Sequence, residues 1–255
     1  MKHSRFYIMP AIMAALALSA CGGKSSSPSL DFDRINVEKT VSIDNSKEAP
    51  QCHVVLDILQ ARNATNDAGR LINEALVEKI FGMEQLSLQA AADSFANTYT
   101  RDYHKNMSPL YQEDKNDKAK RAWYEYRYTV STETRDGGNG ITNYLIDIDY
   151  YEGGAHGIKQ LLTMNFDNKT GRQVKLTDIF GANYEETLTK QLLEALLDKT
   201  GDKNIEALHQ HGYLYSMDMF IPENYIIDED KVTFIYNPYE IAPYSEGCIE
   251  LDIKR

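Results

Sequence analysis

The sequence predicts an α+β fold, mostly antiparallel sheet with helices packed on it, in two consecutive modules. Runs of alternating apolar residues, typical of half-buried strands, recur along the chain of 255 residues. The expected helices and strands are grouped locally rather than alternating regularly, which disfavours a parallel α/β fold. The turn sequence Asp-Gly-Gly-Asn-Gly at 136–140 predicts the boundary between a module at 32–138 and a module at 139–255.

The first twenty residues, 1–20, are typical of a bacterial lipoprotein signal peptide. A basic head precedes an apolar segment at 8–18 that is too short to span a bilayer. Leu18-Ser19-Ala20-Cys21 then matches the lipoprotein cleavage box, in which the cysteine thiol receives the lipid. We therefore expect a mature chain that begins at lipidated Cys21, continues through a flexible tether at 21–31, and is extracytoplasmic. The alternative is an ordinary secretory signal with a chance cysteine.

The charge balance limits the possible partners. The whole chain has 27 basic and 38 acidic residues, for a formal net charge of −11. Cleavage would remove Lys2 and Arg5, leaving 25 basic residues against 38 and a net charge of −13. An acidic surface disfavours nucleic acid and suits a basic partner. The serines that follow Lys24 favour a periplasm-facing position on the outer membrane.

Two cysteines, Cys52 and Cys248, remain once Cys21 is lipidated. An oxidising compartment favours a disulfide between them, which would connect the first third of the chain to its last strand. In the chain-entropy model, closing so long a loop stabilises the fold by about 4 to 5 kcal/mol. The alternative is a pair of buried free thiols.

The first module is expected to begin with two strands and two helices. Apolar residues at 35–43 suit an edge strand, and the residues at 52–58 alternate cleanly. Asn66 is expected to cap a helix that stops at Gly82. Ser87 is expected to cap a second helix with one apolar face.

The end of the first module shows a loop and an aromatic strand. The second helix should reach about Tyr103, because the following segment at 107–120 is polar and contains Pro109. That segment is predicted to be a loop. Residues 123–130 alternate between a tyrosine-rich face and a polar face, which predicts a strand.

The second module is organised around a strand that ends in a glycine-rich turn. Alternating residues from Tyr144 to Tyr150 predict the strand, and Gly153, Gly154 and Gly157 follow it on both sides of His156. Glycine permits positive backbone angles or a close backbone approach, which would fix the direction of the His156 side chain.

The remaining elements of the second module are simpler. The pattern predicts a return strand at 158–166, a third strand through 174–176, helices at 184–199 and 204–210, a hairpin around 228–231 and a last strand at 248–253.

Several motifs of the second module resemble an extracytoplasmic domain family found at the C terminus of the anti-sigma factor RsiV and ahead of the catalytic domain in PdaC-type peptidoglycan deacetylases. They are Gly153-Gly154-Ala155-His156-Gly157, Asn165-Phe166-Asp167 with Thr170-Gly171, Asp178-Ile179-Phe180, and Tyr239-Glu240-Ile241-Ala242-Pro243-Tyr244 with Gly247. Residues 32–135 resemble the companion module of the same proteins in pattern. The resemblance implies a sensing role, because the RsiV domain binds lysozyme, and it carries over neither the deacetylase nor the sigma-factor activity.

The candidate functional residues are those of the turn and of an aromatic, proline-containing loop. Gly153, Gly154, His156 and Gly157 are predicted to form a binding surface with Tyr239 and Tyr244. The alternatives are that His156 locks the turn through a backbone carbonyl, or that the tyrosines cover a sheet edge. We expect no metal and no cofactor, because His209 and His211 lack a metal-ligand spacing with other residues.

Three functions remain open from the sequence. The first is a lipid-anchored envelope protein that binds a lysozyme-like protein or a peptidoglycan fragment, with no catalytic residue. The second is a cell-wall hydrolase that uses His156 and a nearby carboxylate. The third is a purely structural envelope lipoprotein.

Overall fold

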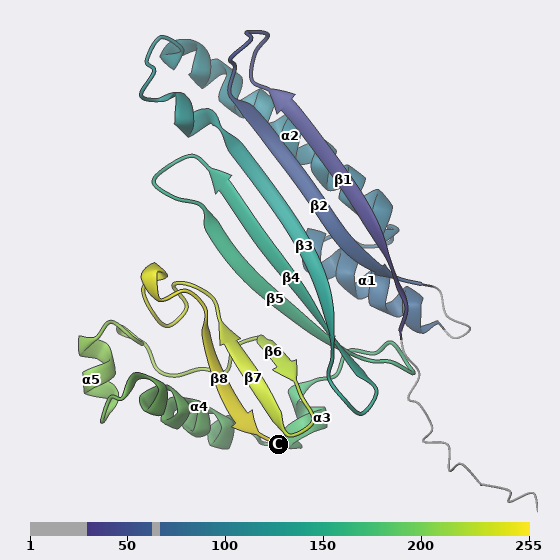
Figure 1. Ribbon diagram of the computed structural model, residues 1–255, viewed down its shortest axis with the longest axis vertical. Coiled ribbons are helices and arrows are strands. Elements are labelled where there is room, and N and C mark those ends of the chain that lie inside the picture. Colours follow the sequence, from purple (N-terminus) through teal and green to yellow (C-terminus); the bar gives the residue numbers. More distant parts are fainter. Residues whose placement is uncertain (1–29, 63–66) are drawn as a thin grey trace, which may run out of the picture.

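The computed structural model describes residues 30–62 and 67–255. The predicted signal peptide, the lipidation site at Cys21, most of the tether and the expected helix cap at Asn66 lie outside the described residues. The structure has two sheets, a five-stranded sheet in the order β1-β2-β3-β4-β5 and a three-stranded sheet in the order β6-β7-β8. It confirms the predicted α+β class (Figure 1).

The five-stranded sheet is mixed. All its neighbouring strands are antiparallel except β2 and β3, which are parallel. Two helices connect this parallel pair, since strands that run in the same direction need a crossover connection. The helices lie on one face of the sheet, over β1 and β2 (Figure 1). The elements are β1 (Phe32–Ser42), β2 (Gln51–Ala61), α1 (Ala68–Phe81), α2 (Leu88–Asp114), β3 (Tyr126–Asp136), β4 (Ile141–Glu152) and β5 (Ile158–Asp167).

Helix α2 is longer than the sequence predicts. It begins at the predicted cap, where the Ser87 hydroxyl accepts a hydrogen bond from the Ala90 N–H, but it continues through Pro109 to Asp114. The predicted loop at 107–120 is therefore wrong over its first half. Tyr111 is buried and packs edge-on against Tyr124. This packing offsets the cost of about 3 kcal/mol for proline inside a helix.

Two strand predictions also need correction. Residues 121–124 form a short 3-10 helix, η1 (Arg121–Tyr124), so β3 begins later than predicted. The predicted strand through 174–176 is reduced to an isolated bridge between Phe166 and Gln173. Residues from Leu176 turn into helix α3 (Leu176–Phe180), because the Asp178 carboxylate accepts a hydrogen bond from the Lys175 N–H at 2.9 Å and caps the first turn.

The three-stranded sheet follows the predicted order of helices and strands. Helix α4 packs against it, and its expected end at Gly201 is confirmed by a left-handed backbone there. The predicted hairpin at 228–231 connects β6 and β7. The elements are α4 (Glu185–Thr200), α5 (Ile205–Gln210), β6 (Asn224–Ile227), β7 (Lys231–Tyr236), η2 (Tyr244–Glu246) and β8 (Ile249–Lys254).

Buried amides connect the two sheets. The Asn143 side chain of β4 donates a hydrogen bond to the Ile227 carbonyl and accepts one from the Ile227 N–H, both at 2.9 Å. Asn237 forms the same pair of bonds with the backbone of Leu161, at 3.0 and 2.7 Å. Asn165 donates to a further backbone carbonyl of β6. We call these residues, Asn143, Asn165 and Asn237, the amide seam.

The predicted module boundary falls within the five-stranded sheet. Positions 138 and 139 lie in the turn between β3 and β4, which pair along their whole length. The structure instead forms two main hydrophobic cores: one contains Ile35 to Phe166, and the other contains Ile141 and then Leu176 to Ile253. The division between sheets therefore follows the end of β5.

The predicted disulfide is not formed. Cys52 and Cys248 are both free, and they belong to different parts of the fold. Cys52 lies in β2, fully buried in the first core, where desolvation raises the pKa of its thiol to about 12. Cys248 precedes β8 and is exposed, with its Sγ 4.0 Å from Asn237 Oδ1. The predicted disulfide was wrong because Cys52 lies in the five-stranded sheet, whereas Cys248 directly precedes the last strand of the three-stranded sheet.

Candidate functional site

The turn that follows β4 requires glycine at defined positions. Gly153 has a φ of +84°, and a Cβ there would lie 2.6 Å from the Trp123 carbonyl oxygen. A Cβ on Gly157 would lie 2.9 Å from the Tyr150 carbonyl oxygen. Gly154 has a φ of +97° but open space around it. Gly153 and Gly157 therefore permit close packing against backbone carbonyls, and Gly154 permits the reversal of the chain.

This turn presents His156 to solvent beside two tyrosines. The His156 Nδ1 lies 2.8 Å from the Gly157 carbonyl oxygen, which can only accept, so Nδ1 carries a proton. In the neutral ring, Nε2 then accepts a hydrogen bond from the Tyr239 hydroxyl at 3.3 Å. The imidazole also stacks on Tyr244, with ring centroids 4.6 Å apart and an interplanar angle of 24°. The ring is thus held from three sides.

Tyr239 occupies a backbone position that usually belongs to glycine. Its φ is +72°. The Glu240 N–H donates to the Asn237 carbonyl at 3.1 Å, which closes a four-residue turn with Pro238 at its second position. Proline followed by a positive φ is typical of a type II turn, whose third position favours glycine or asparagine. The strained conformation presents the Tyr239 ring, which is 61% exposed.

A neighbouring loop extends the exposed aromatic surface. Leu214 and Ser216 also have positive φ angles, of 50° and 59°. The Leu214 N–H donates to the Ile241 carbonyl at 2.8 Å, which places this loop beside the Tyr239 turn. Tyr215, between the two strained residues, is 78% exposed. Non-glycine residues with positive φ concentrate at functional sites, where the strain is part of the function. We call His156, Tyr239 and Tyr244 the aromatic rim, and Tyr215 lies on the adjoining loop.

Carboxylates surround the aromatic rim without contacting His156. The Glu246 carboxylate accepts a hydrogen bond from the Tyr213 hydroxyl at 3.1 Å, and Glu240 accepts one from the Asn237 N–H at 2.8 Å. Both nitrogens of the His156 ring are engaged by Gly157 and Tyr239. Among the described residues, no group of three or more His, Cys, Asp or Glu side chains is arranged to hold a metal ion. Of the helices within 30–62 and 67–255, none is long and apolar enough to cross a bilayer.

The structure brings the predicted candidate residues of the turn and the loop together. Gly153, Gly154, His156 and Gly157 come from the end of β4, and Tyr239 and Tyr244 come from the loop before β8. Sequence reasoning missed the role of the loop at 213–217, because positive φ at Leu214 and Ser216 has no signal in residue type. The closely spaced Tyr213 and Tyr215 were the available indication.

Comparison with known families identifies the C-terminal part of the chain. Residues 177–255 match the family model described as a protein of unknown function, DUF3298. This part of the chain is therefore similar to DUF3298 domains. It agrees with the expected resemblance to an extracytoplasmic domain family of unknown function. The matched residues include Tyr239 and Tyr244, whereas His156 lies before them, so the aromatic rim joins the matched segment to the turn that follows β4.

Solved structures extend the similarity to most of the chain. A DUF3298 family member from Bacteroides fragilis has a TM-score of 0.80 and 29% identity, covering 89% of this chain and 91% of that chain. A DUF3298 family protein from Pseudomonas aeruginosa shares the fold, with a TM-score of 0.60 and 19% identity over 89% of this chain and 92% of that chain. No curated protein matches this chain.

Proposed function

We propose that this chain is a lipid-anchored, extracytoplasmic binding protein of the bacterial envelope, and that its aromatic rim recognises a lysozyme-like protein or a peptidoglycan fragment. One observation carries the proposal: His156, Tyr239 and Tyr244 stack together at the surface, although Tyr239 must adopt a strained backbone to take part. A merely structural loop would place glycine at that position. Strain retained at an exposed ring favours a binding role.

The chemistry of the aromatic rim suits either kind of ligand. Tyrosine rings offer rigid contact area at low entropic cost, and their hydroxyls remain available for hydrogen bonds. Glu240 and Glu246 lie on the same loop, and the net charge of the chain is −11. A basic protein would meet complementary charge, which speeds association and makes it salt-dependent. The resemblance to the lysozyme-binding domain of RsiV points the same way.

The anchor is part of the same proposal. Cleavage before Cys21 and lipidation of its thiol would hold the folded part at a membrane through the tether at 21–31. Metabolic labelling of the whole chain with a palmitate analogue tests this step. We expect incorporation that Cys21→Ser abolishes, and equal labelling of that variant would contradict the anchor.

Calorimetric titration tests the binding role. Residues 24–255 are titrated with lysozyme and, separately, with soluble peptidoglycan fragments, at low and raised salt. We expect saturable heat with one of them, and at least a tenfold weaker affinity for Tyr239→Ala or Tyr244→Ala, since rim anchors cost about 1.4 kcal/mol or more when truncated. Leu110→Ala, on the remote helix α2 and 48% exposed, serves as the control. No heat with either partner would contradict the proposal.

The contacts of His156 favour binding over hydrolysis. A general base needs a ring nitrogen whose lone pair can reach the substrate proton, and here the only unprotonated nitrogen, Nε2, accepts from the Tyr239 hydroxyl. Turnover of purified peptidoglycan, measured for the natural sequence and for His156→Ala, separates the two functions. Release of muropeptides that disappears in His156→Ala would support the hydrolase and overturn the binding role as the main function.

A further inference from the structure

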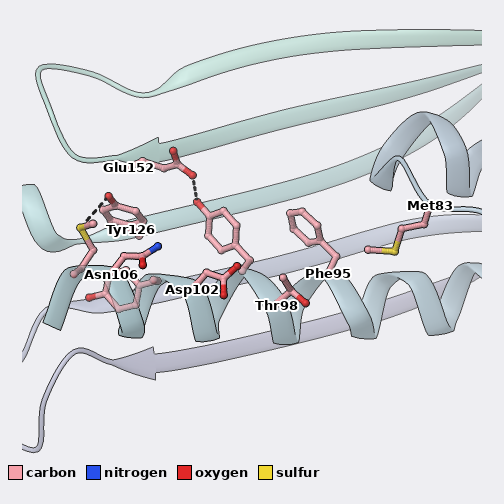
Figure 2. Close-up of a pocket in the computed structure, with 10 residues that line it drawn as sticks. Met83, Phe95, Thr98, Asp102, Asn106, Tyr126 and Glu152 are labelled. Carbon is pink, nitrogen blue, oxygen red and sulfur yellow. Dashed lines mark hydrogen bonds between the residues drawn. The ribbon is translucent and has the colours of Figure 1, made fainter.

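A cavity lies on the opposite face of β4 from the amide seam. Helix α2 and the ends of β3 and β4 enclose a cavity of about 390 Å³. Figure 2 shows its lining residues arranged along α2, with Glu152 reaching toward the helix from the end of β4. This volume falls in the range of about 300–1,000 Å³ that is typical of small-molecule sites. The residues that line it are Met83, Phe95, Thr98, Tyr99, Asp102, Tyr103, Asn106, Met107, Tyr126 and Glu152.

The walls of this cavity are ring faces and thioethers. Tyr103 donates its hydroxyl to the Tyr124 carbonyl at 2.8 Å, and the Tyr126 hydroxyl contacts Met107 Sδ at 3.4 Å. Tyr99 donates to Glu152 Oε1 at 2.7 Å. Because each of these tyrosine hydroxyls has a partner, the three rings that line the cavity are fixed in place. The Tyr103 and Tyr126 rings lie 5.0 Å apart, tilted by 51°.

The charged groups of the cavity are all negative. Asp102 and Glu152 line it, and none of the ten lining residues is basic. Glu152 accepts from Tyr99 but forms no ion pair with any basic side chain in the described part of the chain. Burial is the main cause of the raised pKa values of Tyr99 and Cys52, and the nearby Glu152 carboxylate raises both further. A fixed negative charge beside aromatic faces attracts cations.

We infer that this cavity binds an organic cation with an apolar body, such as a substituted ammonium or guanidinium group on a hydrocarbon or aromatic framework. The apolar part contacts Phe95, Tyr103 and Tyr126, and the cation lies against Tyr99 and the carboxylate of Glu152, whose 2.7 Å hydrogen bond to each other stays in place. Asp102 also lines the cavity, but its carboxylate is paired with Arg101 Nε at 3.1 Å, so Glu152 supplies the unpaired negative charge. A neutral ligand would gain the apolar contacts alone, and an anion would be repelled.

The methyl groups of Met83 and Met107 report directly on this cavity. Both residues line it, whereas Met164, in the first core, and Met219, in the second core, do not. Protein labelled with ¹³C at the methionine methyls is titrated with benzyltrimethylammonium, benzyl alcohol and phenylacetate, which share the ring and differ in charge. We expect saturable shifts of Met83 and Met107 with the cation, at an affinity about tenfold or more above that for the alcohol. The other methionine methyls should stay unshifted.

Two variants separate charge from shape. Glu152→Gln keeps the acceptor for Tyr99 and removes the charge, so affinity for benzyltrimethylammonium should fall about tenfold while that for benzyl alcohol stays the same. Asp93→Asn removes one exposed charge from the same helix outside the cavity and should change neither affinity. Equal affinities for cation and alcohol, or an equal loss in both charge variants, would overturn the inference. Shifts spread over all methionines would also overturn it.

This site is independent of the aromatic rim. Glu152 faces α2, and the rim begins at His156, beyond the Gly153 turn. Tyr239→Ala should therefore leave the titration of Met83 and Met107 unchanged. If Tyr239→Ala loses lysozyme or peptidoglycan binding but keeps the cation titration, the two sites act separately. Failure of either proposal can then be told from failure of the other.

Discussion

The amide seam and the aromatic rim both connect the same two sheets, but they do so by opposite means. Seam residues are buried polar side chains whose bonds replace those of water, and Asn143 is fully inaccessible to solvent. In the rim, His156 and Tyr239 are exposed and Tyr244 is half-buried, and the three rings are connected by stacking and by one hydrogen bond of 3.3 Å. Asn237 of the seam connects the two regions, since its side chain pairs with Leu161 and its carbonyl begins the turn that carries Tyr239. The seam fixes the arrangement that the rim then uses.

Stability should depend mainly on the seam. Asn143→Ala would leave the N–H and the carbonyl of Ile227 buried without partners, and each such group costs about 1–3 kcal/mol. We expect the free energy of unfolding to fall by about 2–4 kcal/mol, measured by urea denaturation. Asn36→Ala, an exposed position on β1, is the control and should change stability by less than about 0.5 kcal/mol. A loss below about 1 kcal/mol in Asn143→Ala would mean that water molecules take over the hydrogen bonds to Ile227 in that variant.

The turn between β4 and β5 contains two glycines that can be compared directly. Both Gly153 and Gly154 have positive φ angles, but only Gly153 lies against backbone, since a Cβ added there would lie 2.6 Å from the Trp123 carbonyl oxygen. Gly154→Ala should cost about 1–2 kcal/mol from the backbone conformation alone. Gly153→Ala should cost more, because the chain must also move away from Trp123. Equal thermal stabilities of the two variants would show that the turn adjusts freely.

The sequence could predict the rim better than the seam. Alternation from Tyr144 to Tyr150, followed by glycines, located the end of the strand and the turn that carries His156, because period and residue type both encode them. Asn143 lies on the opposite face of the same strand, where an asparagine usually faces solvent. Only the packing of the three-stranded sheet there makes it a buried connector, and no local pattern encodes that packing.

The organic-cation site could not be predicted for a related reason. Its wall includes Met107, the first residue of the segment at 107–120 that the sequence assigns to a loop because of Pro109. Burial of Tyr111 against Tyr124 keeps that segment helical. Tertiary packing thus overrides the local preference for a break, and the cavity depends on this. The cysteine pairing was wrong for the same reason: spacing along the chain does not report which sheet a residue joins.

The smallest expected effect distinguishes function from stability at the rim itself. Tyr239→Gly removes the ring and relieves the positive φ of 72° at the third position of a type II turn. Glycine has no steric penalty there, so we expect stability unchanged or raised by about 0.5–1 kcal/mol, whereas Tyr239→Ala keeps the strain and should not be stabilised. Both variants should lose binding equally in the calorimetric titration. A Tyr239→Gly chain that is clearly less stable than Tyr239→Ala would mean that the ring stabilises the fold, and that its contacts with His156 and Tyr244 are structural.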